Sequence, residues 1–181
     1  IRQVIYVKWG SRREKELAED IHALVSFSGV VGKAKSEEQV VPHHFAVLQQ
    51  SRQACIASGL LKSSIDALQE AGIISQEGPE DVELIGRSKI DKVVEMIIQQ
   101  PRSEKKLVFC HYRREIDRIS AALSKQGLKV ESFDGRTKQA TREELLASAE
   151  IDVLVLQIKT GCEGLNLQSF NQVYFVTPHW N

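Results

Sequence analysis

The 181-residue sequence contains few groups that support metal, disulfide or membrane chemistry. Its three cysteines, Cys55, Cys110 and Cys162, are far apart and have no Cys-x-x-Cys or Cys/His spacing. This pattern excludes a zinc finger and favours reduced thiols that pack in an intracellular protein. No segment approaches the roughly 18 apolar residues that a membrane span requires, so no membrane partner is expected.

Neither sign of charge is in excess, because 24 basic residues balance 24 acidic ones. Binding of a polyanion would therefore depend on a local patch rather than on the net charge of the chain. Hydrophobic residues at 42% and charged residues at 27% are typical of a globular protein. At about 150 residues per domain, the length predicts one domain that carries an insertion.

The sequence also lacks the residues that phosphoryl transfer requires. There is no G-x-x-x-x-G-K-[ST] motif, because Gly32-Lys33 is followed by Ala34 and Phe27 stands where the first glycine would be. No predicted strand ends in an acidic pair that would bind Mg²⁺. We therefore expect no catalytic residue and no metal site in this chain.

The N-terminal half predicts one strand and several helices. Gln3 to Lys8 is rich in β-branched and aromatic residues, which is typical of a strand. Ser11 followed by Glu14 predicts a capping box at the start of a helix. Helical spacing between Phe45 and Ile74 predicts two short helices. The acidic segment 75–87 contains Gly and Pro and is typical of a linker.

After Ser88 the pattern changes to a regular alternation of helices and short apolar strands. The predicted strands are Leu107 to Cys110, Val130 to Phe133, Val153 to Leu156 and Val173 to Val176. Helices are predicted from apolar spacing at Ile90 to Ile97, at Ile116 to Leu128 and around Leu145-Leu146. Because these strands lack polar alternation, we expect them to be buried on both faces, which predicts an α/β protein with a parallel sheet flanked by helices. The chain is divided into residues 1–9 (first strand), 10–87 (helical insertion and linker) and 88–181 (sheet domain).

Ligands of such sheets bind outside the carboxyl ends of the strands. The residues that follow the predicted strands are polar or basic: His111 to Arg114, Asp134 to Thr137, Gln157 to Asn166 and Thr177 to Trp180. Backbone amides at helix N-termini, together with Arg and Lys, favour phosphate groups. Each turn taken alone is more typical of an ordinary soluble βα turn.

Taken together, these segments resemble the second RecA-like lobe of a superfamily 2 helicase of the SWI/SNF type. KKLVFCHYRREIDRISAAL (Lys105 to Leu123) is similar to motif IV of that family, and VESFDGRTKQATREELL (Val130 to Leu146) is similar to the motif that follows it. Val153 to Asn181 is similar to motif V and the Trp-Asn that precedes motif VI. Phe45 to Leu61 and Ser88 to Ile97 resemble helical segments of the same lobe. The chain ends before motif VI, so we expect it to be a piece of a longer protein.

One departure from the family pattern concerns motif V. The family usually has Ser-Thr or Leu-Thr before the basic residue of this motif, whereas this chain has Gln157-Ile158. Ile158 therefore stands where a hydroxyl would contact a phosphate. Lys159, Thr160 and Gly161 match the family.

The resemblance implies the second lobe of a DNA-dependent ATPase or translocase. Such a lobe closes on the first RecA-like lobe around ATP and Mg²⁺, which the first lobe mostly binds, and grips DNA, expected to be duplex. The implied nucleotide-binding residues are Gly164, Asn166 and Glu163. The implied nucleic-acid-binding residues are His111, Arg113, Arg136, Thr137, Lys159, Thr160 and Trp180. Alternatively, Gly164 and Asn166 only shape a turn, the basic side chains are solvated and Trp180 packs.

Two other classes of function fit the sequence. The lobe could be a non-catalytic RecA-like interaction module or a DNA-binding scaffold. Residues 58–74 (SGLLKSSIDALQEAGII) also resemble a small helix-turn-helix, which would make the helical half a separate DNA reader. ATPase motifs in the preceding part of the gene would exclude the interaction module.

Overall fold

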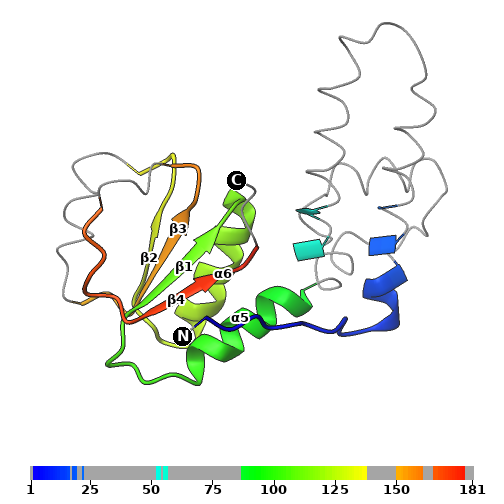
Figure 1. Cartoon of the computed structure of the whole chain (residues 1–181), viewed down its shortest axis with the longest axis horizontal. Helices are drawn as coiled ribbons and strands as arrows, with labels where there is room; N and C mark the ends of the chain where they lie inside the picture. Colours follow the sequence, from blue (N-terminus) through cyan, green and yellow to red (C-terminus); the bar gives the residue numbers. More distant parts are fainter. Residues whose placement is uncertain are drawn as a thin grey trace, which may run out of the picture. The chain divides into compact units, whose positions relative to one another are not determined.

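The computed structural model describes residues 2–16, 18, 19, 22, 52, 53, 55, 56, 87–137, 150–160 and 165–177. The chain divides into two compact units, Ile1–Lys89 and Ile90–Asn181. The second unit contains a four-stranded sheet, and its strands fan out beside helix α6 in Figure 1. The division into residues 1–9, 10–87 and 88–181 stays a prediction.

The sheet is parallel throughout and has the strand order β2-β3-β1-β4. Its strands are β1 (Lys106–Cys110), β2 (Val130–Phe133), β3 (Val153–Gln157) and β4 (Gln172–Phe175). Helix α5 (Ser88–Ile98) precedes β1, and α6 (Arg113–Lys125) connects β1 to β2. The predicted α/β architecture, a RecA-like parallel sheet flanked by helices, is confirmed. Each of the four strands predicted after Ser88 agrees with the structure to within about one residue.

One face of the sheet forms an apolar cluster. Because side chains alternate along a strand, Leu107 of β1 lies on the same face as Leu154 and Leu156 of β3, and Phe133 of β2 joins them. Ile151 completes the buried part of this cluster. The connection between β3 and β4 packs against it through Leu165, Leu167 and Phe170. This connection therefore covers the face while leading the chain across to β4.

Helix α6 covers the other face of the sheet. It contacts β1, β2 and β3, and its apolar residues Ile116, Ile119 and Leu123 are fully buried. The alternation places Val108 and Val155 on that face, and both are fully buried as well. The crossover connection through α6 lets β1 and β2 run parallel, with β3 between them in the sheet.

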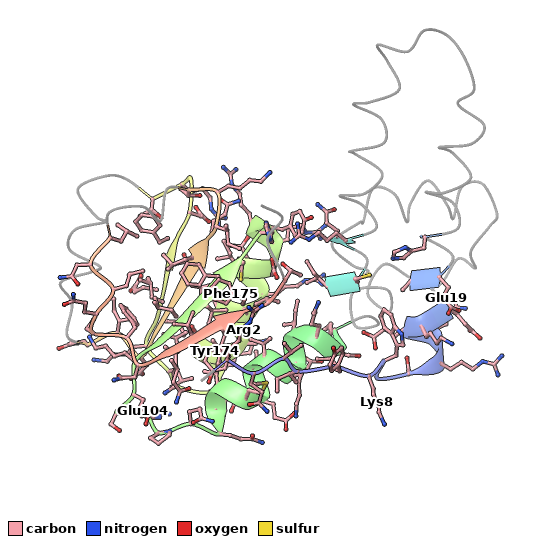
Figure 2. All side chains as sticks on the ribbon, viewed as in Figure 1. Arg2, Lys8, Glu19, Glu104, Tyr174 and Phe175 are labelled. Carbon is pink, nitrogen blue, oxygen red and sulfur yellow. The ribbon has the colours of Figure 1, made fainter. Side chains whose placement is uncertain are left out.

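The outer strands are less buried than the sequence predicts. All of β3 except Gln157 is buried, whereas β4 alternates between half-buried and exposed positions. Tyr174 and Phe175, labelled in Figure 2, are adjacent on β4 and so face opposite sides of the sheet. Phe175 is 66% exposed and stacks on Phe109 with 4.9 Å between ring centroids. The expectation of strands buried on both sides thus holds for β1 and β3, because β2 and β4 are the edges of the described sheet.

Lys106 is a charged residue buried at the amino end of β1. Its side chain is fully buried, and its Nζ donates a hydrogen bond of 2.6 Å to the carbonyl of Pro101. Burial lowers the pKa of Lys106, partly offset by Asp152 and Glu104. The lysine thereby ties the turn after α5 to the first residue of the sheet.

Two details predicted for the N-terminal half differ in the structure. The strand expected at Gln3 to Lys8 is wrong, because residues 2–9 have no strand pairing and Tyr6 is 90% exposed. Residues 12–16 are helical, and the Glu14 N–H donates to the Ser11 hydroxyl as a capping box requires. The Glu14 carboxylate, however, accepts hydrogen bonds from the backbone N–H groups of Gly10 and Ser88 rather than returning to Ser11.

The other predictions for this half fall mainly outside the described residues. These are the helices between Phe45 and Ile74, the helix-turn-helix at 58–74 and nearly all of the linker. Positions 52, 53, 55 and 56 are helical. The helix predicted around Leu145-Leu146 of the second unit is also outside the described part.

Two adjacent isoleucines of α5 test the packing of the sheet domain. Ile97 is 1% exposed and Ile98 is 43% exposed. We expect Ile97→Ala to lower the free energy of unfolding by about 2–4 kcal/mol, because it removes buried methyl groups and leaves a cavity. Ile98→Ala is the matched control and should cost less than about 1 kcal/mol. Urea denaturation followed by circular dichroism measures both, and equal losses would contradict the burial of α5.

Candidate nucleic-acid interface

The turn between β1 and α6 is held by a buried carboxylate. Glu115 is fully buried, and its Oε2 accepts hydrogen bonds from the backbone N–H groups of His111 (2.9 Å) and Tyr112 (3.2 Å). A carboxylate in the first turn of a helix also interacts favourably with the helix dipole. This fixes the direction in which α6 leaves the sheet, and Arg113 begins the helix with an exposed side chain.

Cys110, just before this turn, has a structural role. It is fully buried, and burial together with the nearby Glu115 raises its pKa well above the ordinary value. A thiol that resists ionisation is a poor nucleophile. The packing role predicted for Cys110 agrees with this environment, while Cys162 lies outside the described residues.

The turn after β2 is organised around Asp134, which is 1% exposed. Its Oδ1 accepts a 2.7 Å hydrogen bond from the backbone N–H of Arg136, and its Oδ2 accepts one of 2.9 Å from Arg136 Nε. These hydrogen bonds lower the pKa of Asp134 and raise that of Arg136. The Asp134 N–H donates to the hydroxyl of Thr137, so Thr137 helps to close the turn.

Two guanidinium groups flank this turn. Arg136 reaches from the turn to α6, where its Nη2 lies 2.7 Å from Asp117 Oδ1. Arg113, the first residue of the same helix, also reaches the turn: a Cβ added at Gly135 would lie 3.0 Å from Arg113 Nη2. The absence of a side chain at Gly135 therefore leaves room for Arg113 against the backbone of the turn.

The turn after β3 is hydrogen-bonded to the end of β1 and the turn that follows it. Gln157 donates from Nε2 to the carbonyl of His111 (3.1 Å), and Thr160 donates its hydroxyl hydrogen to Gln157 Oε1 (2.8 Å). The Ile158 N–H also donates to the Cys110 carbonyl (2.9 Å). Gln157 thus has a connecting role at the position where the chain departs from motif V. Lys159, between these residues, is exposed.

The structure brings most of the predicted nucleic-acid-binding residues to one edge of the sheet. His111 and Arg113 follow β1, Arg136 and Thr137 follow β2, and Lys159 and Thr160 follow β3. His111 is 6% exposed, so it contributes to the turn more than to the surface. Trp180 lies outside the described residues.

The predicted nucleotide-binding residues are only partly described. Asn166 lies in the β3–β4 connection, is exposed and accepts a 3.3 Å hydrogen bond from the Gln168 N–H through Oδ1. Glu163 and Gly164 lie outside the described residues. Their roles stay predictions.

Asp117 is a residue of this edge that the motifs in the sequence do not single out. Its position one helical turn after Arg113 is the one signal for it in the sequence, because residues four apart in a helix share a face. That spacing indicates a carboxylate near the basic turns, although it does not show that its partner is Arg136.

Within the described residues, no group of three or more His, Cys, Asp or Glu side chains is arranged to hold a metal ion. The carboxylates near this edge are committed to other partners: Glu115 accepts backbone hydrogen bonds, and Asp117 and Asp134 pair with Arg136. These residues do not form a ligand set for Mg²⁺. No helix in the same part of the chain is long and apolar enough to cross a membrane.

The described unit is an α/β domain with a parallel sheet, and basic turns lie at the carboxyl edge where such sheets bind their ligands. Residues 88–181, just over half of the sequence, match the helicase conserved C-terminal domain, and the chain belongs to this family. It is 32% identical over 108 residues to the DNA repair protein RAD5 of Cryptococcus neoformans, a match that covers 55% of this chain and 9% of that protein.

Two solved structures share the fold. The SWI2/SNF2 ATPase C-terminal domain of Sulfolobus solfataricus superposes with a TM-score of 0.71 and 15% identity, covering 98% of this chain and 72% of that chain. The SWI2/SNF2 ATPase core of the same organism in complex with dsDNA gives a TM-score of 0.68 and 15% identity, covering 95% of this chain and 34% of that chain. The helicase C-terminal domain of this chain therefore has the fold of a SWI/SNF-type RecA-like C-terminal lobe. The chain spans about a tenth of the length of the curated relatives that it matches.

The two described cysteines should differ in reactivity. Cys55 is exposed, whereas Cys110 is buried with a raised pKa. At pH 8 we expect iodoacetamide to alkylate Cys55 at least about tenfold faster than Cys110, because the reaction needs an accessible thiolate. Peptide mapping by mass spectrometry measures both rates, and labelling in denaturant is the control. Comparable rates in the folded chain would contradict the packing of Cys110.

Proposed function

We propose that this chain is the second lobe of a DNA-dependent ATPase or translocase. In the intact protein it closes on the first RecA-like lobe around ATP and grips the backbone of duplex DNA. The observation that carries this proposal is the gathering of Arg113, Arg136 and Lys159 at the carboxyl edge of the sheet, on three separate turns. A chain of zero net charge thereby acquires a local site for phosphate groups.

The comparisons support this proposal at the level of the family. The family is one of ATP-dependent helicases and translocases, and one structure of the same fold is a SWI2/SNF2 core in complex with dsDNA. Action on DNA inside the cell is part of the proposal, because a relative is a DNA repair protein. Stepwise translocation or remodelling of a DNA complex would follow from alternate opening and closing of the two lobes.

The proposal assigns the chemistry of ATP hydrolysis to the first lobe. ATP supplies the free energy and Mg²⁺ neutralises phosphate charge when both are bound there. The carboxylates described at the carboxyl edge of this lobe already hold backbone or guanidinium groups. The lobe would contribute to the nucleotide site through the motif V segment that contains Glu163, Gly164 and Asn166.

The chain alone should not hydrolyse ATP. We expect its phosphate release to equal that of a buffer control, with or without duplex DNA, because the sequence has neither the lysine loop nor the acidic pair of an ATPase. A coupled assay over a range of ATP concentrations measures this rate. If DNA-stimulated ATP hydrolysis follows the chain through successive purification columns, the assignment of ATP hydrolysis to the first lobe is wrong.

DNA binding should be weak, independent of sequence and strongly dependent on salt. Each phosphate contact releases condensed counterions, so Arg113→Ala and Lys159→Ala should each flatten the slope of log K against log salt by roughly one unit. Fluorescence anisotropy with a labelled duplex at several salt concentrations measures the slopes.

Lys129 provides the matched control for this experiment. It is exposed like Lys159 but lies beside the first residue of β2, at the opposite edge of the sheet. Lys129→Ala should leave the slope unchanged. If all three variants keep the slope of the parent chain, or if all three lower it equally, the carboxyl edge is not the DNA-binding surface.

A further inference from the structure

The guanidinium group of Arg136 has two carboxylate partners in different environments. On one edge its Nε and Nη2 both donate to Asp134, whose side chain is 2% exposed and which also accepts a hydrogen bond from the backbone N–H of Arg136. Its outer side faces Asp117 of α6: Nη2 lies 2.7 Å from Oδ1, and Nη1 lies 3.4 Å from Oδ2. Asp117 and Arg136 are both about half exposed.

The outer side of Arg136 is the side that a phosphate would bind. Arginine recognises phosphate by presenting two parallel N–H groups to two oxygens. Asp134 occupies the inner edge and is buried, so a solvent-borne phosphate cannot approach there. The remaining N–H groups of Nη1 and Nη2 face Asp117, which presents two oxygens to them in a similar arrangement, and the Arg136 side chain is about half exposed.

We propose that Asp117 is an intramolecular competitor of the DNA backbone for Arg136, a positioning residue that limits the affinity of this lobe for DNA. The inference rests on the proposed function, since it assumes that the carboxyl edge binds DNA phosphates. When a phosphate replaces Asp117, one anionic partner of Arg136 is exchanged for another. Arg136 therefore adds little to the affinity or to the salt dependence while Asp117 is present.

The charges around the turn support this interpretation. Arg113 and Arg136 are balanced by Asp117 and Asp134, and Arg113 reaches the same turn at Gly135. Asp134 is buried and forms part of the turn, so its charge is structural. Asp117 is on the surface of α6, and exposed ion pairs of this kind contribute little to stability. Removing its charge should leave the fold intact and change the local balance from zero to one positive charge.

The experiment compares Asp117→Asn with a control of equal charge. Glu150→Gln also removes one negative charge from an exposed ion pair, because Glu150 Oε2 lies 2.7 Å from Lys129 Nζ at the opposite edge of the sheet. With a labelled random-sequence duplex, Asp117→Asn should bind about two- to fivefold more tightly than the parent chain. Its salt slope should be steeper by up to about one unit, because Arg136 then makes an additional phosphate contact. Glu150→Gln should leave the slope unchanged.

A second pair of variants tests whether the tighter DNA binding of Asp117→Asn depends on Arg136. In Arg136→Lys the charge next to Asp134 is kept, but one ammonium group cannot present the two outer N–H groups of the guanidinium. When Asp117→Asn is added to Arg136→Lys, the salt slope should increase by less than half of the increase that Asp117→Asn causes in the parent chain. Thermal melting of every variant verifies that the fold is retained.

Each outcome separates the inference from the proposed function. If the parent chain binds DNA with the expected salt dependence and Asp117→Asn behaves like Glu150→Gln, the inference is overturned and the proposed function stands. The inference is also overturned if Asp117→Asn increases the DNA affinity and the salt slope equally with and without Arg136→Lys. The effect would then come from the change in net charge and not from Arg136. If neither the parent chain nor Asp117→Asn binds DNA, the proposed function fails and the inference fails with it.

Discussion

The parallel register of β1 on β3 is the constraint on which the candidate interface depends. Cys110 lies opposite Gln157, so the two strands end at the same level and their turns begin side by side. Val108 and Val155, opposite each other in the middle of the pair, are fully buried. A slip by one residue would exchange the two faces of a strand and move every apolar side chain away from its layer. Burial thereby fixes the register, and the register brings the turns together.

The sheet and the approximate place of the interface could be predicted because both follow from local patterns. Continuous apolar runs such as Val153 to Leu156 require burial on both faces, which indicates a central strand of a parallel sheet. The rule that ligands bind at the carboxyl ends of strands then predicts Arg113, Arg136 and Lys159 as site residues. The structure places all three at that edge.

Features that depend on the tertiary fold could not be predicted in this way. The composition of Gln3 to Lys8 favours a strand, but a strand also requires a neighbour, and residues 2–9 pair with no described strand. Glu14 has the spacing of a capping box, yet its carboxylate accepts from Ser88, which is remote in sequence. Likewise, the pairing of Arg136 with Asp117 depends on how α6 crosses the sheet, which no local pattern encodes.

The burial of Lys106 gives the amino end of the sheet its own response to pH. Its pKa is lowered in the folded chain, so the unfolded chain binds more protons between that lowered value and the ordinary value near 10.4. Its contribution to stability therefore rises as the solution becomes alkaline through this window. At the carboxyl end the pKa of Asp134 is lowered, and the stability that it contributes is lost only as the pH falls below about 4. The two ends of the same strands thus titrate in widely separated ranges, and between these ranges neither group makes the stability of the sheet sensitive to pH.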